Sequence, residues 1–418
     1  MIRSMFAAVT SLRNHQTFMD TVANNIANVN TTGFKSGRID FQDVLNQNLR
    51  GAVAPTSMKG GVNAAQVGLG VAIGGIDNFM TQGDLQPTGK VTDLAIQGDG
   101  FFQLSDGQQI LYTRDGSFDV GSDGRLVSPS TGLLVQGWQA DDTGAIDTGQ
   151  PIGDLNIPFN RMSPPTPSTS VGVAGNLDSQ AADGTAVETV MTAFDSLGSP
   201  HNITMRFVKV PFANAWDWEA STIDPAIVTP NPLAGGTLTF DTAGLPQTDP
   251  SQPEGVRDLQ FNNGADDATG ATAINLEMDS MTGFSQQSTV NVDKQDGHEA
   301  GSLTSFTVGP DGTVNGIFSN GFNQALGKIS LARFTNPGGL TRVGSNAFQL
   351  SVNSGLPIIG SPGGTGFGTV NSGNLEMSNA NLAQQFTDMI RAQRGFQANS
   401  RMITTSDEML QELIGLKR

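Results

Sequence analysis

The sequence predicts a mainly β protein whose nested β-rich domains lie between an N-terminal and a C-terminal α-helix that pair as a coiled coil. Three observations predict this fold class. Apolar residues recur every seven positions in both terminal segments. Between these segments, Asp-Gly pairs stand beside short β-prone runs, a pattern typical of tight hairpins. Residues 151–253 hold 13 of the 20 prolines, which indicates a separate insert.

The N-terminal segment predicts a helix because residues 2–30 contain neither proline nor glycine. Its apolar series keeps a strict seven-residue repeat, the pattern of a coiled-coil seam, although His15 interrupts it. We expect the members of this series to contact other helices on assembly: Met5, Leu12, Met19 and Ile26.

The C-terminal segment predicts a second helix, with Ser378 as its expected N-cap. Its assembly series has the same spacing and comprises Leu382, Met389, Phe396, Ile403 and Leu410. Gly395 weakens this helix by about 1 kcal/mol relative to alanine. Two interpretations remain open: an ordinary helix pair packed on a globular core, or termini that become helical only when they pair with each other and with neighbouring copies.

The central chain predicts two groups of consecutive hairpins and an inserted β-domain. The first group comprises residues 101–104, 110–113, 117–120 and 125–127, and the second continues from 305–321 through 328–334 to 347–352. Strands at 192–196 and 201–210 belong to the insert. The expected division is a terminal helical domain (1–70 plus 366–418), a β-rich middle domain (71–154 plus 286–365) and an outer β-domain (155–285). The role of residues 211–275 stays open.

Composition excludes several classes of function. The 418 residues include no cysteine, which excludes disulfides and thiolate metal sites. The formal charge of −17 argues against nucleic acid as a ligand. Residues 51–376 carry 12 basic and 32 acidic side chains, so the acidity lies in the middle of the chain. We therefore expect the middle to face solvent and the ends to face protein.

No motif supports catalysis, a cofactor or a small-molecule substrate. The pattern from Asp119 to Gly124 resembles the start of a calcium loop, but Ser130 stands where a bidentate glutamate belongs, so a structural turn is favoured. His201 follows a Ser-Pro turn and is expected to be solvated. Trp216 and Trp218 alternate along one strand, as core residues do. The N-terminus lacks the features of a cleaved secretory signal, so we expect no signal cleavage.

Three segments resemble the axial rod and hook proteins of the bacterial flagellum. They are NNIANVNTTGFKSGRIDFQDVL (24–45), the run from QVGLGVAIGG to QGDGFFQL (66–104), and the run from SGNLEMSN to ELIGL (372–416). The insert, including TAFDSLGSPHNITMRFVKV (192–210), resembles the hook branch of that family. A distal rod protein shares the three segments but leaves little room for the insert, and it is the alternative interpretation. An adhesin or fibre protein does not account for the paired heptads.

The resemblance implies a structural subunit, located in the flagellar hook, that polymerises into a tubular universal joint transmitting torque. Expected partners are other copies of the chain, the distal rod protein, the hook cap, the hook–filament junction proteins and the type III export apparatus. The residues expected to end the first helix and turn the chain outward are Asn24, Asn25, Asn28, Thr32 and Gly33, with Phe34 anchoring the turn. Phe41 and Leu45 resemble the family's export-gate motif; a short amphipathic turn is the alternative.

Overall fold

The computed structural model describes residues 2–57, 59–141, 143–159, 162–211, 214–224, 233–247, 255–259 and 272–415. The chain divides into two compact units. Unit 1 comprises Met1–Pro158, Phe306–Asn315 and Ala325–Arg418, and unit 2 comprises Phe159–Ser305 and Gly316–Gln324. The protein is mainly β with its two terminal helices in contact, which confirms the predicted fold class. The finer division into three domains stays a prediction.

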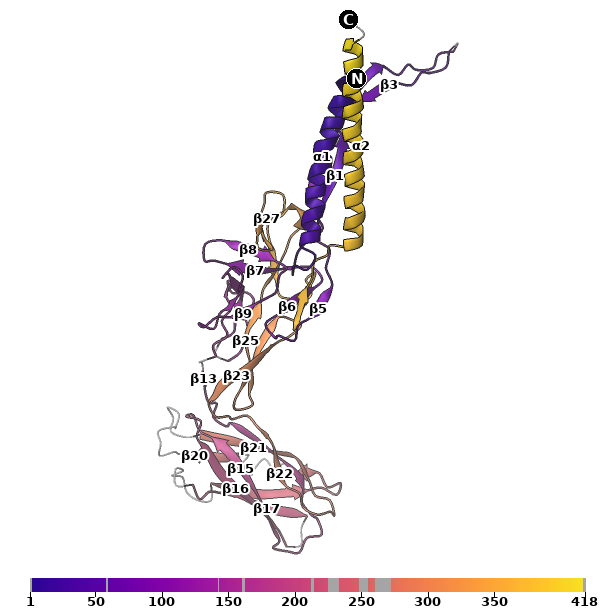
Figure 1. Ribbon diagram of the computed structural model, residues 1–418. Helices are drawn as coiled ribbons and strands as arrows, with labels where there is room; N and C mark the ends of the chain where they lie inside the picture. The colour runs from indigo at the N-terminus through magenta and orange to yellow at the C-terminus, as the bar shows by residue number, and fades with distance from the viewer. Residues whose placement is uncertain are drawn as a thin grey trace. The chain divides into compact units, whose positions relative to one another are not determined.

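The two terminal helices, α1 (Ile2–Ala27) and α2 (Leu382–Gly415), lie side by side in unit 1 (Figure 1). The predicted cap of the second helix is wrong by three residues. Asn381 is the cap, because its side-chain oxygen accepts a hydrogen bond from the Gln384 amide at 3.2 Å. The Ser378 hydroxyl instead accepts a bond from the Ala380 amide, ahead of the helix. None of the described helices combines the length and apolar character needed to span a membrane.

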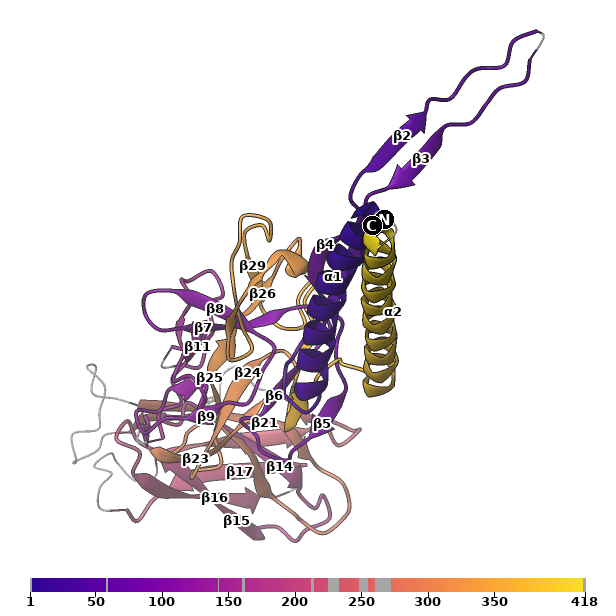
Figure 2. The same ribbon diagram turned by 45° about the horizontal axis from the view of Figure 1, so that its top comes forward.

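A two-stranded arm follows α1 (Figure 2). Strands β1 (Gly37–Asp43) and β4 (Val71–Asn78) pair antiparallel, and β2 (Asn46–Arg50) and β3 (Ala65–Gly68) extend the arm outward. The near half packs on α1, where the Asn14 side chain donates to the Val71 carbonyl at 2.7 Å. Nearly all side chains of β2 and β3 are exposed.

The main sheet of unit 1 brings together strands far apart in the sequence, in the order β25–β11–β7–β8–β28–β27. Its aromatic core includes Phe101, Tyr112, Phe334 and Phe348. The strands of this sheet are β7 (Phe101–Ser105), β8 (Ile110–Thr113), β11 (Leu134–Gln139), β25 (Asn323–Ile329), β27 (Thr341–Gly344) and β28 (Ala347–Gln349). Shorter elements flank it: β5 (Leu85–Pro87), β6 (Leu94–Gln97), β9 (Asp119–Val120), β10 (Leu126–Val127), β12 (Gly153–Asp154), β26 (Leu331–Arg333), η1 (Pro337–Gly339), β29 (Ile358–Gly360), β30 (Thr369–Ser372) and β31 (Asn374–Glu376).

The predicted run of hairpins over residues 101–127 is only partly correct. Strands β7 and β8 pair, as do β9 and β10, but β8 takes β28 as its second neighbour instead of β9. After β8 the chain passes against Leu94, whose amide donates to the Gly116 carbonyl at 2.9 Å. A Cβ at Gly116 would lie 1.6 Å from the Leu94 carbonyl oxygen, so this crossing requires glycine. A long-range contact therefore replaces the expected local hairpin.

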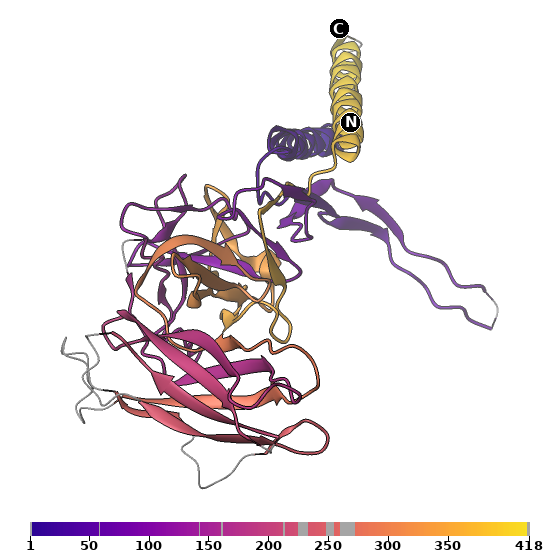
Figure 3. The ribbon, with the colours of Figure 1, turned by 90° about the horizontal axis from the view of Figure 1, so that it is seen from below.

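Unit 2 is a β-sandwich with one core (Figure 3). Its sheets have the orders β15–β16–β17–β18–β19 and β20–β21–β14–β22, and both contribute to a cluster that includes Trp216, Trp218, Val171 and Leu276. Both tryptophans are buried, as predicted. The strands are β13 (Met162–Ser163), β14 (Ser170–Asn176), β15 (Ala186–Phe194), β16 (Pro200–Lys209), β17 (Ala215–Ser221), β18 (Ala234–Phe240), β19 (Pro246–Gln247), β20 (Gly255–Leu259), β21 (Thr272–Thr282) and β22 (Asn291–Gln295). The unit boundary falls within β23 (Gly301–Val308), β24 (Thr313–Phe318) and the first residues of β25.

Candidate assembly site

The contact between the helices is antiparallel and joined by polar side chains. Asn25 donates to the Gln385 side chain at 3.0 Å near the end of α1, and Asn399 donates to the Ser11 hydroxyl at 2.7 Å. Between these bonds, His15 lies against Gly395. As the residue number falls along α1 it rises along α2, so the two helices run in opposite directions.

Small residues allow the helices to approach closely. Ala8 and Val22 of α1 are buried, as are Ala392 and Ser406 of α2. A Cβ at residue 395 would lie 2.7 Å from the His15 ring, so any residue other than glycine would clash with that ring unless the helices moved apart. This packing explains a glycine that intrinsic helix propensity disfavours.

The predicted assembly series lies mainly beside the helix contact. Eight of its members are half-buried within this single chain: Met5, Leu12, Met19, Ile26, Met389, Phe396, Ile403 and Leu410. Leu382 is exposed. Other large apolar side chains of the helices are exposed as well, namely Phe6, Val9, Phe386, Ile390, Met402, Met409 and Ile414. The helix pair therefore keeps a substantial apolar surface for other molecules.

The turn after α1 is held by side chains of its own motif. Asn28 donates to the Asn24 carbonyl at 2.9 Å, and Thr32 donates to Asp115 at 3.0 Å. Gly33 adopts a φ of +66°, and a Cβ there would lie 2.5 Å from the Asp115 amide nitrogen. Phe34 is buried beneath the guanidinium of Arg342, which also donates to the Lys35 carbonyl.

Three buried charged residues, Lys35, Arg114 and Glu376, lie where both chain ends meet the β-rich part of unit 1; we call them the Glu376 cluster. The Lys35 ammonium is 2.5 Å from one Glu376 carboxylate oxygen, and the Arg114 guanidinium is 3.2 Å from the other. Arg114 also donates to the Gly98 carbonyl at 2.7 Å. Each of the three residues is at most 3% exposed, so water contributes little to their solvation.

The electrostatics of this cluster are unbalanced, because two cations share one carboxylate. Burial lowers the pKa of the Lys35 ammonium and of the Arg114 guanidinium, although Glu376 acts in the opposite direction on both. Glu376 is thus the carboxylate that offsets the burial of both cations, and Asp99 also offsets the burial of Arg114. Removing Glu376 would leave two like charges together in a site of low polarity.

The two residues of the export-like motif lie near the junction of the two halves of the arm, where β1 ends and β2 begins. Phe41 is in β1 and packs edge-on against Phe18 of α1, with ring centres 5.7 Å apart. Leu45 is 67% exposed. Both residues are therefore exposed, although one side of the Phe41 ring packs on the helix.

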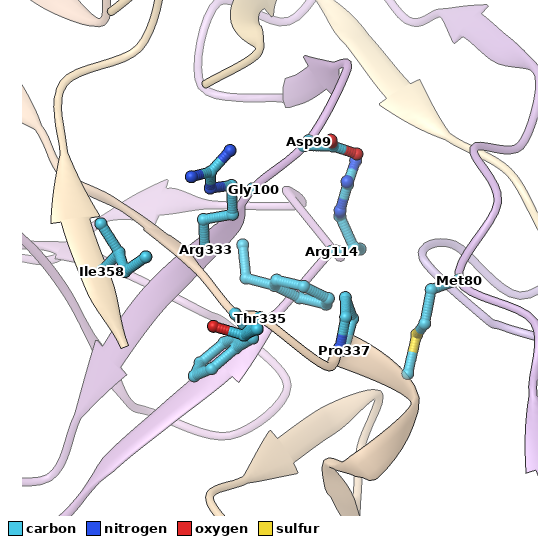
Figure 4. Close-up of a pocket in the computed structure, with 10 residues that line it drawn as sticks. Met80, Asp99, Gly100, Arg114, Arg333, Thr335, Pro337 and Ile358 are labelled. Carbon is cyan, nitrogen blue, oxygen red and sulfur yellow. The ribbon is translucent and has the colours of Figure 1, made fainter. Parts of the chain in front are cut away.

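A cavity of about 430 Å³ lies beside Arg114, with Met80, Asp99, Phe101, Arg333 and Ile358 among its lining residues. Figure 4 shows Arg114 and Arg333 on its wall together with Asp99. These residues provide no pair of acid and base suited to catalysis. In the described ranges, no three histidine, aspartate or glutamate side chains are placed to share a metal ion.

The expectation for His201 is wrong. This side chain is 3% exposed, and its two ring nitrogens lie 3.1 Å from Asp195 and 2.7 Å from Asp224. The turn between β15 and β16 brings Asp195 to one side of the ring, and the chain beyond β17 brings Asp224 to the other. Each ring nitrogen therefore faces a carboxylate, so neither is left to bind a substrate. The three side chains link the turn between β15 and β16 to the segment that follows β17.

Sequence reasoning missed the roles of Lys35, Arg114 and Glu376. Lys35 lies inside the motif TTGFKSG and Glu376 inside SGNLEMSN. In each motif, a single charged residue among small residues is the feature that could have indicated such a role. Lys35 and Glu376 are 341 positions apart, so their pairing has no local pattern.

A β-rich body, chain ends that leave it as paired helices, and apolar helix faces left exposed define a structural subunit of an elongated assembly. Family models match in four places: "Flagella basal body rod protein" at residues 5–35, "Flagellar hook protein FlgE/F/G D1 domain" at 95–177, "Flagellar basal body protein FlaE D2 domain" at 165–298 and "Flagellar basal body rod FlgEFG protein C-terminal" at 371–416. The flagellar hook protein FlgE of Borreliella burgdorferi is 40% identical, and that of Treponema pallidum 39%, over the full length of each chain.

The chain belongs to the flagellar hook protein family. It is a structural hook subunit that self-polymerises, is located in the flagellar hook, and is not an enzyme. The flagellar basal-body rod protein FlgG of Bacillus subtilis is 29% identical, again over the full length of both chains. A crystal structure of Helicobacter pylori flagellar hook protein FlgE2 matches in fold with a TM-score of 0.51 at 15% identity, covering 70% of this chain and all of that one.

Proposed function

We propose that copies of this chain associate through α1 and α2 into the inner layer of a tube, with the β-rich parts outside. The exposed and half-buried apolar side chains of the helix pair support this proposal. Burial of apolar surface is the main driving force for such association. The residues proposed to contact neighbouring copies are Met5, Leu12, Met19, Ile26, Leu382, Met389, Phe396, Ile403 and Leu410.

The β-rich parts have a different task in this proposal. A curved, rotating tube requires each row of subunits to shorten and lengthen on every turn while torque passes along it. Outer contacts must then be small, polar and reversible, because a large apolar patch would lock them. The 32 acidic and 12 basic side chains of residues 51–376 favour such hydrated contacts. The tube would thus act as a universal joint.

Further partners belong to the same proposal. The ends of the tube would contact the distal rod protein, the hook cap and the hook–filament junction proteins, and the chain would leave the cell through the type III export apparatus. Phe41 and Leu45 are the proposed export signal, which the resemblance of residues 41–45 to the family's motif supports. The proposed domain division follows these layers: terminal (1–70 plus 366–418), middle (71–154 plus 286–365) and outer (155–285).

The substitution Phe396→Ala tests the proposed helix contacts. Where this ring is buried between copies, its loss costs about 3–5 kcal/mol per subunit, so polymerisation should be abolished while the β-strands stay folded. Electron microscopy of the assembled protein and circular dichroism of the soluble chain measure the two effects. Phe367→Ala, a half-buried phenylalanine outside the helices, is the matched control. A normal hook built from the Phe396→Ala protein would refute the proposal.

A further inference from the structure

Glu376 is contacted from three separate parts of unit 1. Lys35 reaches it from the segment that follows α1, and the Gly83 amide donates to it at 2.9 Å from the segment that follows the arm. Arg114 reaches it from the β-rich part. The backbone contributes too, because the Gly33 amide donates to the Glu376 carbonyl at 2.7 Å. One residue at the end of β31 therefore holds the N-terminal segment and the C-terminal segment together.

A second set of bonds continues this link toward both helices. The Asn379 side chain accepts a bond from the Ser36 amide at 2.7 Å and donates to the Phe79 carbonyl at 2.9 Å. The Gly37 amide donates to Asn25, in the last turns of α1, at 2.9 Å, and Asn25 in turn donates to Gln385 in the first turn of α2. The start of α2 is thus bonded to the N-terminal segment, and the end of α1 is bonded to α2.

We infer that Lys35 and Glu376 are positioning residues that make the docking of the two terminal helices mutually dependent. Lys35 cannot be buried without the Glu376 carboxylate, because an uncompensated buried ammonium is unstable. The carboxylate in turn loses its closest cation when the N-terminal segment leaves. Detachment of either chain end therefore weakens the attachment of the other, and thermodynamic linkage makes the two effects equal.

This role is separate from the contacts between copies. It lies within one chain, at residues buried from any neighbour, so it does not depend on the proposed inner layer of the tube. It would ensure that each subunit presents both helices together or neither. A subunit with one docked helix would offer only part of the apolar surface on which assembly depends.

Tryptic cleavage of the soluble full-length chain tests the inference, because both helices carry exposed arginines. Cleavage at Arg13 reports on α1, and cleavage at Arg391, Arg394 or Arg401 reports on α2. Lys35→Met removes the ammonium and keeps most of the side-chain volume. We expect it to accelerate cleavage of α2 as strongly as that of α1, by roughly 150- to 5,000-fold if the buried pair has its usual strength. Glu376→Gln should do the same.

The matched control is Lys328→Met, which breaks the more exposed pair with Asp311 in the β-rich part and should leave both rates unchanged. Lys35→Arg keeps the charge and should restore slow cleavage. The double variant Lys35→Met/Glu376→Gln should accelerate cleavage far less than the product of the single effects. If Glu376→Gln lost its β-structure by circular dichroism, Lys35→Met alone would decide the question. Acceleration confined to α1 in the Lys35→Met protein would overturn the inference. It would also be overturned if trypsin cut both helices of the wild-type protein as fast as it cuts the chain unfolded in urea.

Discussion

The imidazole of His15 in α1 occupies the space over Gly395 in α2, where a Cβ would lie 2.7 Å from two of its ring atoms. This contact explains two features of the sequence that are unfavourable by themselves, a histidine within an apolar series and a glycine within a helix. Each is required by the other, because the ring fills the space that the glycine leaves. The close approach of the two helices depends on this pair.

Gly395→Ala should therefore destabilise the helix pair, although alanine favours an isolated helix by about 1 kcal/mol. The added methyl group forces the His15 ring or the helices apart, and overpacking of this kind costs about 1–3 kcal/mol. The double variant His15→Ala/Gly395→Ala should recover stability, because the clash is absent and the propensity gain remains. Thermal unfolding of the helices by circular dichroism measures all three proteins. A Gly395→Ala protein more stable than wild type would contradict this account.

The sequence predicted what depends on local patterns. The absence of proline and glycine in residues 2–30 and the seven-residue spacings define both helices. The strands predicted at 192–196 and 201–210 overlap β15, which ends at Phe194, and β16, which ends at Lys209. The cap at Asn381 instead of Ser378 shows the limit of this reasoning, because both residue types can cap and the choice depends on tertiary contacts.

The sequence could not predict contacts between residues far apart in the chain. Arg114 and Glu376 are 262 positions apart, and His201 meets Asp224 only because β16 and β17 are adjacent strands. The pairing of β8 with β28, where the sequence predicted pairing with β9, also depends on residues far apart in the chain. In each case the decisive partner is chosen by the packing of the whole unit, which no periodicity in the sequence encodes.

Gly33→Ala should destabilise unit 1 by more than the usual backbone penalty. The positive φ at this residue costs a non-glycine side chain about 1–2 kcal/mol. The added methyl group would also lie 2.5 Å from the Asp115 amide nitrogen, so the turn must move. Gly89→Ala is the control, because Gly89 has a φ of +75° and an added Cβ there would have no atom within 4 Å. Urea unfolding of both variants separates the two costs, and equal losses of stability would show that the contact with Asp115 is unimportant.

His201→Phe should destabilise unit 2 by about 3 kcal/mol, since it removes the group that bridges the buried Asp195 and the partly buried Asp224. Phenylalanine keeps the volume of the ring, so the loss reports on polar contacts more than on a cavity. His298→Phe is the matched control, because His298 is half-buried and stacks on Phe322 with ring centres 4.4 Å apart. Fluorescence of the buried Trp216 and Trp218 follows unfolding. Similar losses in both variants would argue against the bridging role.

The stability of unit 2 should include a contribution from Asp296 that disappears in acid. Asp296 accepts hydrogen bonds from the Thr169 amide at 2.9 Å and the Ser170 amide at 3.0 Å. Burial raises the pKa of this carboxyl, but these bonds and that of the Thr169 hydroxyl outweigh it, and the pKa lies below its ordinary value of 3.8. The folded state therefore binds the proton less readily than the unfolded chain.

The contribution of Asp296 is complete above pH 3.8 and is lost as the pH falls through the lower pKa of the folded state. Asp296→Asn, which resembles the protonated side chain, should be less stable than wild type at pH 7, and the two proteins should converge as the pH falls below 3.8. Urea unfolding of both proteins between pH 7 and acid measures the difference. Asp183→Asn is the control for the substitution itself, because Asp183 is exposed. A difference for Asp296→Asn that stayed constant into acid would show that its charged hydrogen bonds do not stabilise the fold.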